Sequence, residues 1–320
     1  PKAALAGAKA RGSAEPVAQA PAPSPAPAAA EAVLPDTEDT PQALAAPTPP
    51  PPAPPRPGLR ERWAGLGEIS VGVGLAQRRY ELRAPTAAGN RSFDGSPFPE
   101  FVLRAELYPL AALTRRFVRN VGVAVDYSRH LAVSTDLPAN GARPDTCDFG
   151  SEVATRSQQL LADLVLRWPL GLKTRFSPTF AASAGVGLRE FALGPNDVLT
   201  GFNYRFVHVA LAARVPLGTR LAALELGGDL RPLLGVGQDA VDALGERSSG
   251  LAWSVHGGLR GELNSGLFYF ARAEYQRYTL DLAGLDAAGE PLRPCTPDNG
   301  DPTSGTDTYL RLMLGAGYQL

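Results

Sequence analysis

The sequence predicts an all-β fold: a ten-stranded, antiparallel, up-and-down transmembrane β-barrel over residues 66–320, preceded by a disordered Pro/Ala-rich tail over residues 1–65. Three observations predict this fold. After Gly65, apolar residues alternate with small or polar residues in segments of about 10 to 18 residues. The connections between these segments alternate between short and long. In each segment, one face carries charge and the other carries essentially none.

The tail contains roughly half of the 31 prolines and almost no aromatic or β-branched residues. Such a segment cannot build a core, and its prolines favour extended polyproline II at about 3.1 Å per residue. We therefore expect a semi-rigid linker. The chain opens Pro1-Lys2-Ala3 without Met or an apolar segment, so we expect a removed signal peptide or a fragment of a longer protein.

The first strand is expected over residues 67–83. Ile69, Val71 and Val73 share one face of it, while Glu68 and the small residues between them share the other. The same alternation predicts the remaining strands over 98–108, 117–134, 153–168, 176–192, 201–215, 220–234, 250–263, 267–283 and 307–320.

The connections between the predicted strands alternate between short and long along the chain. The tight ones lie near 109–116, 169–175, 216–219 and 264–266, and the long polar ones near 84–97, 135–152, 193–200, 235–249 and 284–306. Five long loops and four short turns require an even number of strands, with both ends of the barrel on the short-turn side.

Charge distinguishes the two faces of the strands. The uncharged face includes Leu103, Leu164, Val209 and Val255, and we expect it to face lipid. Because a charge on the lipid side costs about 2–4 kcal/mol at the bilayer midplane, the charged face should point into the lumen. A water-soluble barrel with the charged face outward stays open at this point. The residues expected in the lumen are Arg104, Glu106, Asp126, Asp163, Arg167, Arg189, Glu225, Asp229, Arg231, Arg260, Glu262, Arg272, Glu274 and Arg311.

The positions of the aromatic residues indicate where the barrel meets the membrane surfaces. Aromatic residues gather at strand ends and predict two interfacial girdles. Those near short turns are Tyr108, Phe117, Trp168, Phe176, Phe268 and Tyr269, and those toward long loops are Tyr80, Tyr127, Phe202, Tyr204, Tyr275 and Tyr278.

Glycine pairs such as Gly185-Val186-Gly187 and Gly315-Ala316-Gly317 predict small lumen-facing positions that leave room for bulky neighbours.

The last predicted strand, 307–320, alternates Leu310, Leu312 and Leu314 with polar or small residues. With the other strands, it makes the chain resemble bacterial outer-membrane β-barrels, whose last strand typically ends in an aromatic residue that the insertion machinery recognises. Leu320 departs from that terminal aromatic, although Tyr318 stands two residues earlier.

The resemblance covers about four-fifths of the chain and identifies no subfamily. It implies a Gram-negative outer membrane, with the loops outside and the tail in the periplasm. The partners it implies are outer-membrane lipid, lipopolysaccharide, the insertion machinery and a periplasmic partner for the tail.

No motif in the chain predicts catalysis, a cofactor or a metal. A net charge of −1 also gives no reason to expect nucleic-acid binding. The histidines at 130, 208 and 256 belong to no metal or nucleophile motif. Omptin surface proteases also have ten strands, but their paired acidic residues and their Asp two before a His are missing here. Asp126 and His130, which share a face, form the remaining carboxylate–imidazole candidate.

Cys147 and Cys295 lie in the second and fifth long loops. Because short and long connections alternate, both loops are expected at the same end of the barrel. A disulfide that pins these loops together and a pair of free thiols are the two hypotheses. Mass spectrometry of a non-reduced digest distinguishes them.

For function, we expect a non-enzymatic barrel with a closed, salt-bridged lumen and five surface loops. The alternative is a narrow channel or a transporter for small solutes or hydrophobic ligands. The third hypothesis is an omptin-like protease with its active site at the rim of the barrel. Aqueous porin channels take about 16–18 strands, whereas barrels of about eight are filled by side chains.

Overall fold

The computed structural model describes residues 65–85, 90–113, 117–131, 133–136, 152–170, 177–194, 200–219, 221–244, 249–263, 266–282 and 302–320. Within them, antiparallel strands form one sheet that closes on itself, because β12 (Ser304–Gln319) pairs with β1 (Gly67–Arg83). The predicted tail lies outside the described residues, apart from Gly65.

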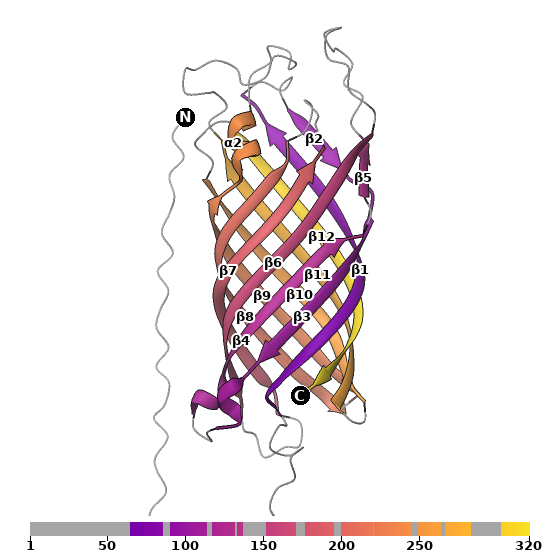
Figure 1. Ribbon diagram of the computed structural model, residues 1–320, viewed down its shortest axis with the longest axis vertical. Helices are drawn as coiled ribbons and strands as arrows, with labels where there is room; N and C mark the ends of the chain where they lie inside the picture. The colour runs from indigo at the N-terminus through magenta and orange to yellow at the C-terminus, as the bar shows by residue number, and fades with distance from the viewer. Residues whose placement is uncertain are drawn as a thin grey trace, which may run out of the picture. The chain divides into compact units, whose positions relative to one another are not determined.

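Ten strands make the barrel wall (Figure 1). β1 and β12 are joined by β3 (Phe98–Leu107), β4 (Val121–His130), β6 (Glu152–Pro169), β7 (Thr179–Leu193), β8 (Phe202–Thr219), β9 (Ala222–Gly235), β10 (Ser249–Glu262) and β11 (Leu267–Asp281). Two short strands, β2 (Arg91–Asp94) and β5 (Val133–Asp136), extend the wall by pairing with β1 and β6. The predicted ten-stranded, antiparallel, up-and-down barrel is confirmed.

The two ends of the barrel differ. At one end lie the 3-10 helices η2 (Pro109–Ala111) and η3 (Phe117–Asn120), and also Gly266, which precedes β11 and whose φ of 85° suits glycine. At the other end lie β2, β5 and the helix α2 (Gln238–Leu244), as Figure 1 shows. We call these the short-turn end and the loop end. β1 begins and β12 finishes at the short-turn end, as predicted. None of the described helices is long and apolar enough to cross a membrane.

An apolar belt surrounds the outside of the wall. Large aliphatic side chains stand exposed on strand after strand, including Val73 at 62%, Leu164 at 66% and Leu211 at 68%. Leaving this much apolar surface in water would be unfavourable, at about 25 cal/mol per Å². The soluble alternative therefore fails, because the outside is apolar and the charged residues lie inside.

The predicted girdles are only partly correct. Phe117, Trp168 and Tyr269 are exposed on the outside, but six of the other predicted members face inward and are buried: Tyr80, Tyr108, Phe202, Tyr204, Phe268 and Tyr278. The reason is strand parity, since Phe202 and Tyr204 alternate with the outward Val207 and Val209 series. Phe176 lies outside the described residues.

The lumen glycines make room for bulky neighbours, as predicted. A Cβ built on Gly187 would lie 2.3 Å from the Phe206 ring, and one on Gly317 would lie 2.3 Å from the Phe268 ring. Large inward aromatics are therefore accommodated because the next strand has no side chain there.

Candidate functional site: the lumen

The loop end of the lumen is filled by an apolar plug. Its core is aromatic, with the rings of Tyr204 and Tyr278 stacked 4.5 Å apart between centroids. From α2, Ala240 and Leu244 join it and are 0% and 2% exposed. The other buried members are Tyr80, Leu82, Phe202, Phe206, Val236, Ala252, Leu280, Leu282 and Tyr309. The helix that follows β9 thus covers the mouth of the barrel.

An ionic network lies among and below these aromatics. Arg78 donates from Nε and Nη2 to the two carboxylate oxygens of Asp307, at 2.8 and 2.7 Å. Tyr204 and Tyr309 donate their hydroxyls to Asp307 Oδ2 at 2.9 and 3.2 Å. The Arg78 guanidinium also lies 3.8 Å from the centroid of the Phe191 ring. Asp307 thus accepts four hydrogen bonds, although the side chains of this pair are almost completely buried.

The network continues along the wall through Glu274 on β11, which lies directly opposite Arg311 in the β11–β12 register. Arg311 donates to Glu100 at 2.8 Å and to Glu274 at 3.0 Å, and Gln276 donates to Glu274 at 2.8 Å. Arg231 donates two hydrogen bonds to the Asp229 carboxylate, at 2.5 and 2.9 Å. Arginine side chains fill the interior at this level, because Arg78, Arg189, Arg231 and Arg311 are each at most 2% exposed.

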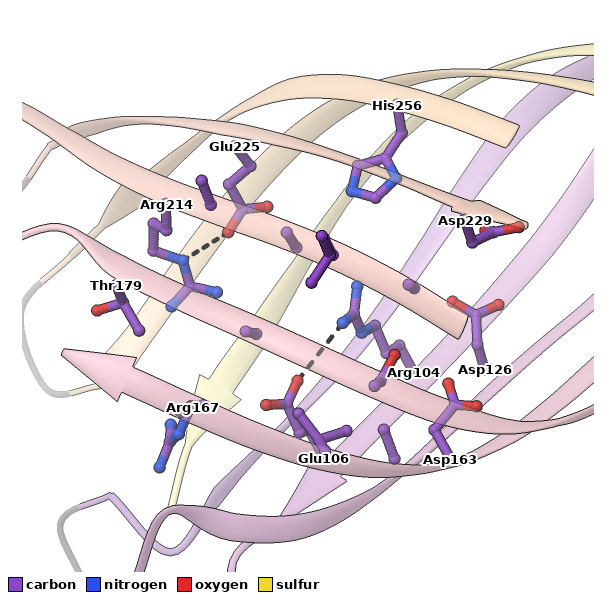
Figure 2. A pocket seen from close by; sticks show the side chains of 18 of the residues that line it. Arg104, Glu106, Asp126, Asp163, Arg167, Thr179, Arg214, Glu225, Asp229 and His256 are labelled. Carbon is purple, nitrogen blue, oxygen red and sulfur yellow. Dashed lines mark hydrogen bonds and ion pairs between the residues drawn. The ribbon is translucent and has the colours of Figure 1, made fainter. Parts of the chain in front are cut away.

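Below the network, toward the short-turn end, the lumen opens into a chamber of about 350 Å³ (Figure 2). Arg119, Asn120, Pro169 and Thr179 line it at the short-turn rim. Its inner, blind end is lined by Asp126, Asp163, Asp229, His208 and His256. Among the described residues, buried side chains therefore fill the loop half of the lumen, while a chamber lies in its short-turn half, whereas the sequence predicted a closed lumen without such a chamber.

Ion pairs hold the wall of the chamber near the rim. Arg260 donates to both oxygens of Glu68 at 2.9 and 2.8 Å, linking β10 to β1 across the lumen. Arg214 donates to Glu225 at 2.7 Å and lies 3.7 Å from Glu68. These side chains are held in place by mutual pairing.

An unexpected carboxylate–imidazole pair lies deeper in the chamber. His208 Nε2 on β8 contacts Asp163 Oδ1 on β6, across the intervening strand β7. Gly185 on β7 permits this, because a Cβ there would lie 2.1 Å from Asp163 Oδ1. His208 is 3% exposed, and its Nδ1 has no hydrogen-bond partner.

The pair suggested by the sequence, Asp126 and His130, is not brought together. His130 Nε2 instead lies 3.8 Å from Glu100, and its ring packs on Phe98 with centroids 3.8 Å apart. Asp126 lies in the chamber. The two residues share a face of β4, but four residues along a strand separate them by about 13 Å, so their side chains do not meet.

All the charged residues predicted for the lumen lie there. The chamber is lined by Arg104, Glu106, Asp126, Asp163, Arg167, Glu225, Asp229 and Arg272, while Arg189, Arg231, Glu274 and Arg311 lie in the network and Arg260 and Glu262 near the short-turn rim.

Two of these charged residues, Arg167 and Glu262, interact with uncharged groups among the described residues instead of forming ion pairs. Arg167 stacks on the Tyr108 ring at 3.4 Å from its centroid and donates to the Gly65 carbonyl oxygen. Glu262 accepts from Gln319 at 3.1 Å.

Sequence reasoning missed several members of the lumen set. They are Glu68, Arg78, Glu100, Gln159, His208, Arg214, Gln276 and Asp307. Their positions share the parity of the charged faces, so alternation along each strand was the signal that could have found them.

Among the described residues, no group of His, Cys, Asp or Glu is arranged to hold a metal ion. Cys147 and Cys295 lie outside the described residues, so their disulfide stays a prediction.

Comparison with known proteins gives a fold-level likeness only. No protein-family model and no curated protein matches the chain. The outer membrane protease OmpT of Escherichia coli is 10% identical, with 79% of this chain and 97% of that chain covered and a TM-score of 0.43. The attachment invasion locus protein Ail of Yersinia pestis is 13% identical, with 79% and 99% covered and a TM-score of 0.25. A mutant of the TodX monoaromatic hydrocarbon channel is 8% identical, with 81% and 92% covered and a TM-score of 0.35.

These similarities assign no activity. The features of the chain itself are decisive: a sheet that closes through β1 and β12, an apolar outer belt and a charged, buried interior. In fold, this chain is a closed, ten-stranded, antiparallel transmembrane β-barrel, the architecture that bacterial outer-membrane proteins have.

Proposed function

We propose that the protein is a non-enzymatic, non-conducting barrel of the bacterial outer membrane that holds its loops at the cell surface and its N-terminal tail in the periplasm. The observation that carries this proposal is the double seal of the lumen. The apolar plug with α2 closes the loop end, and the ionic network fills the level below it. The orientation follows the rule that short turns of such barrels face the periplasm.

The energetics of the network support a permanent seal. A passing solute would have to separate contacts that cross the lumen, such as the Tyr204 hydroxyl on β8 with Asp307 on β12 at 2.9 Å and the Gln276 amide on β11 with Gln159 on β6 at 3.2 Å. Asp307 also pairs with Arg78 on the neighbouring strand β1, and both of these side chains are at most 2% exposed. Leaving a buried polar group unpaired costs about 1–3 kcal/mol, and more for a charged group, so the network opposes opening.

The outer surface supports contact with lipopolysaccharide. Toward the loop end, the outward positions change from aliphatic to basic, and Arg79, Arg129, Arg156, Arg205 and Arg277 are exposed there. Guanidinium groups bind phosphate with charge-assisted hydrogen bonds, and lipopolysaccharide carries phosphate. This proposal concerns anchoring in the outer leaflet and does not depend on the lumen.

Conductance tests the seal. The refolded full chain, shown to be folded by heat-modifiable gel migration, is inserted into planar bilayers. We expect no stable current steps, because the network and the plug lie in series. Regular steps from the wild-type chain would refute the proposal and favour a narrow channel. Hydrolysis of peptides by the same sample would refute the non-enzymatic part.

A further inference from the structure

We propose that the chamber binds a small zwitterionic solute of the α-amino-acid type, which enters from the short-turn end. The inference goes beyond the sealed barrel and is independent of it, because binding in a blind chamber requires no transport. Four features of the chamber carry it: its size, two carboxylates without an arginine partner, two weakly paired guanidinium groups and a buried imidazole nitrogen, Nδ1 of His208, without a hydrogen-bond partner.

The chamber has the dimensions of a ligand site. Its volume of about 350 Å³ falls in the range of about 300–1,000 Å³ found for small-molecule pockets. Rim residues of η3, β6 and β7 line its entrance, and the ionic network closes its inner end. A solute that enters can therefore be held but is not passed on.

Two carboxylates at the blind end form no ion pair with an arginine. Among the described residues, Asp126 lies opposite Arg104 in the β3–β4 register but forms no ion pair or side-chain hydrogen bond, and Asp163 contacts only the imidazole of His208. Asp126 on β4 lies opposite Leu161 on β6, so Asp163, two residues away on β6, is its diagonal neighbour, and Figure 2 shows both at the same end of the chamber. Two adjacent carboxylates with free acceptor atoms suit an ammonium group.

Two guanidinium groups in the same chamber are also poorly matched. Arg104, with a side chain 40% exposed, reaches Glu106 only at 3.4 Å. Arg272 lies 3.7 Å from Glu274, and its buried Nε has no acceptor. Strong pairs in this lumen are shorter, as at Arg260–Glu68 with 2.8 Å. Free donors of this kind suit a carboxylate group.

The combination selects a zwitterion. A simple anion would bind the guanidinium groups but would face the two carboxylates, and a simple cation would meet the reverse problem. A molecule with an ammonium and a carboxylate on one carbon satisfies both sets. His208 adds a further observation, since its Nδ1 is buried at the chamber wall without a partner, and a bound solute can supply one.

Ligand-observed NMR of the full chain refolded in detergent micelles tests the proposal. The probes are L-alanine as the zwitterion, acetate as the anion alone and methylammonium as the cation alone. We expect saturable binding of L-alanine, with the two single-charge probes at least about tenfold weaker. Absence of saturable binding, or equal binding of either single-charge probe, would overturn the proposal and leave a water-filled chamber or a simple ion site.

Matched variants locate the binding. The double variant Asp126→Asn/Asp163→Asn should weaken L-alanine binding by about tenfold or more, because both ammonium acceptors lose their charge. The control Asp94→Asn/Glu190→Asn removes two carboxylates on the outer surface and should leave the affinity unchanged. Equal losses in both variants would place the binding outside the chamber and overturn the proposal.

A second variant keeps the test decisive if the double variant does not fold. Ser183→Phe fills the chamber from β7 without removing a charge, because Ser183 lines it. A folded Ser183→Phe barrel should lose L-alanine binding. Unchanged affinity in that variant would overturn the proposal. Conductance of the wild-type chain is measured separately, so failure of the seal and failure of the binding site give different results.

Discussion

At the residue scale, two neighbouring arginines on β1 show how strand parity sets the role of a side chain. Arg78 points inward and is 2% exposed in its pair with Asp307, while Arg79 points outward and pairs with Asp94, with both side chains more than half exposed. The hydrogen-bond lengths are similar, at 2.7 and 2.6 Å. The energetic consequences differ, since water screens the outer pair and not the inner one.

This contrast gives a stability prediction. Asp307→Asn leaves the Arg78 guanidinium buried without its counterion, so we expect the free energy of unfolding to fall by about 3–5 kcal/mol. The matched change in the outer pair, Asp94→Asn, should cost about 0–1 kcal/mol. Urea titration of the folded gel band in micelles measures both. Equal midpoints for the two variants would show that the inner pair does not stabilise the barrel.

At the element scale, alternation along the sequence predicts the strands well. β1 covers Gly67–Arg83, as predicted. β12 begins at Ser304, three residues before its predicted start, because Ser304, Gly305 and Thr306 carry no apolar alternation and yet pair with β1. Backbone pairing with a neighbouring strand, which a single segment does not reveal, extends the strand there.

The seal could be predicted only in part. Parity identifies the inward charges, but the pairing of Arg78 with Asp307 joins residues 229 positions apart and depends on how the strands are staggered around the wall. The sequence predicts a long polar loop over 235–249, whereas the structure places the helix α2 within it. The signal was present, since Val236, Ala240 and Leu244 recur at helical spacing and are all buried.

The lid formed by α2 can be tested separately from the wall. Ala240 is 0% exposed, so Ala240→Arg should displace α2 from the plug and raise amide hydrogen exchange across 238–244 by about tenfold or more. The bilayer current should stay absent, because the ionic network below remains. Asp239→Arg, at an exposed position of the same helix, is the control and should leave exchange unchanged. Unchanged exchange in Ala240→Arg would show that α2 does not depend on this contact.

At the scale of the whole molecule, the barrel is held together by closure. β12 pairs with β1 from Glu68–Gln319 to Arg83–Ser304, and the Leu320 amide donates to the Gly67 carbonyl oxygen at 2.8 Å. Without this seam, β1 and β12 would each present a row of unpaired backbone groups to lipid. Each such group costs several kcal/mol in a bilayer, so a partly closed sheet is not a stable intermediate form.

Truncation after Thr303 therefore gives the last prediction. It removes β12 and leaves two open edges, so we expect no heat-modifiable species on gels and no protease-resistant core after refolding in micelles. Deletion of residues 1–60 is the matched control, because it removes a segment of the chain that contributes to none of the described strands. That variant should refold and migrate as a compact band. A heat-modifiable band from the truncated chain would show that nine strands can close by themselves, and that the β1–β12 seam is not what completes the wall.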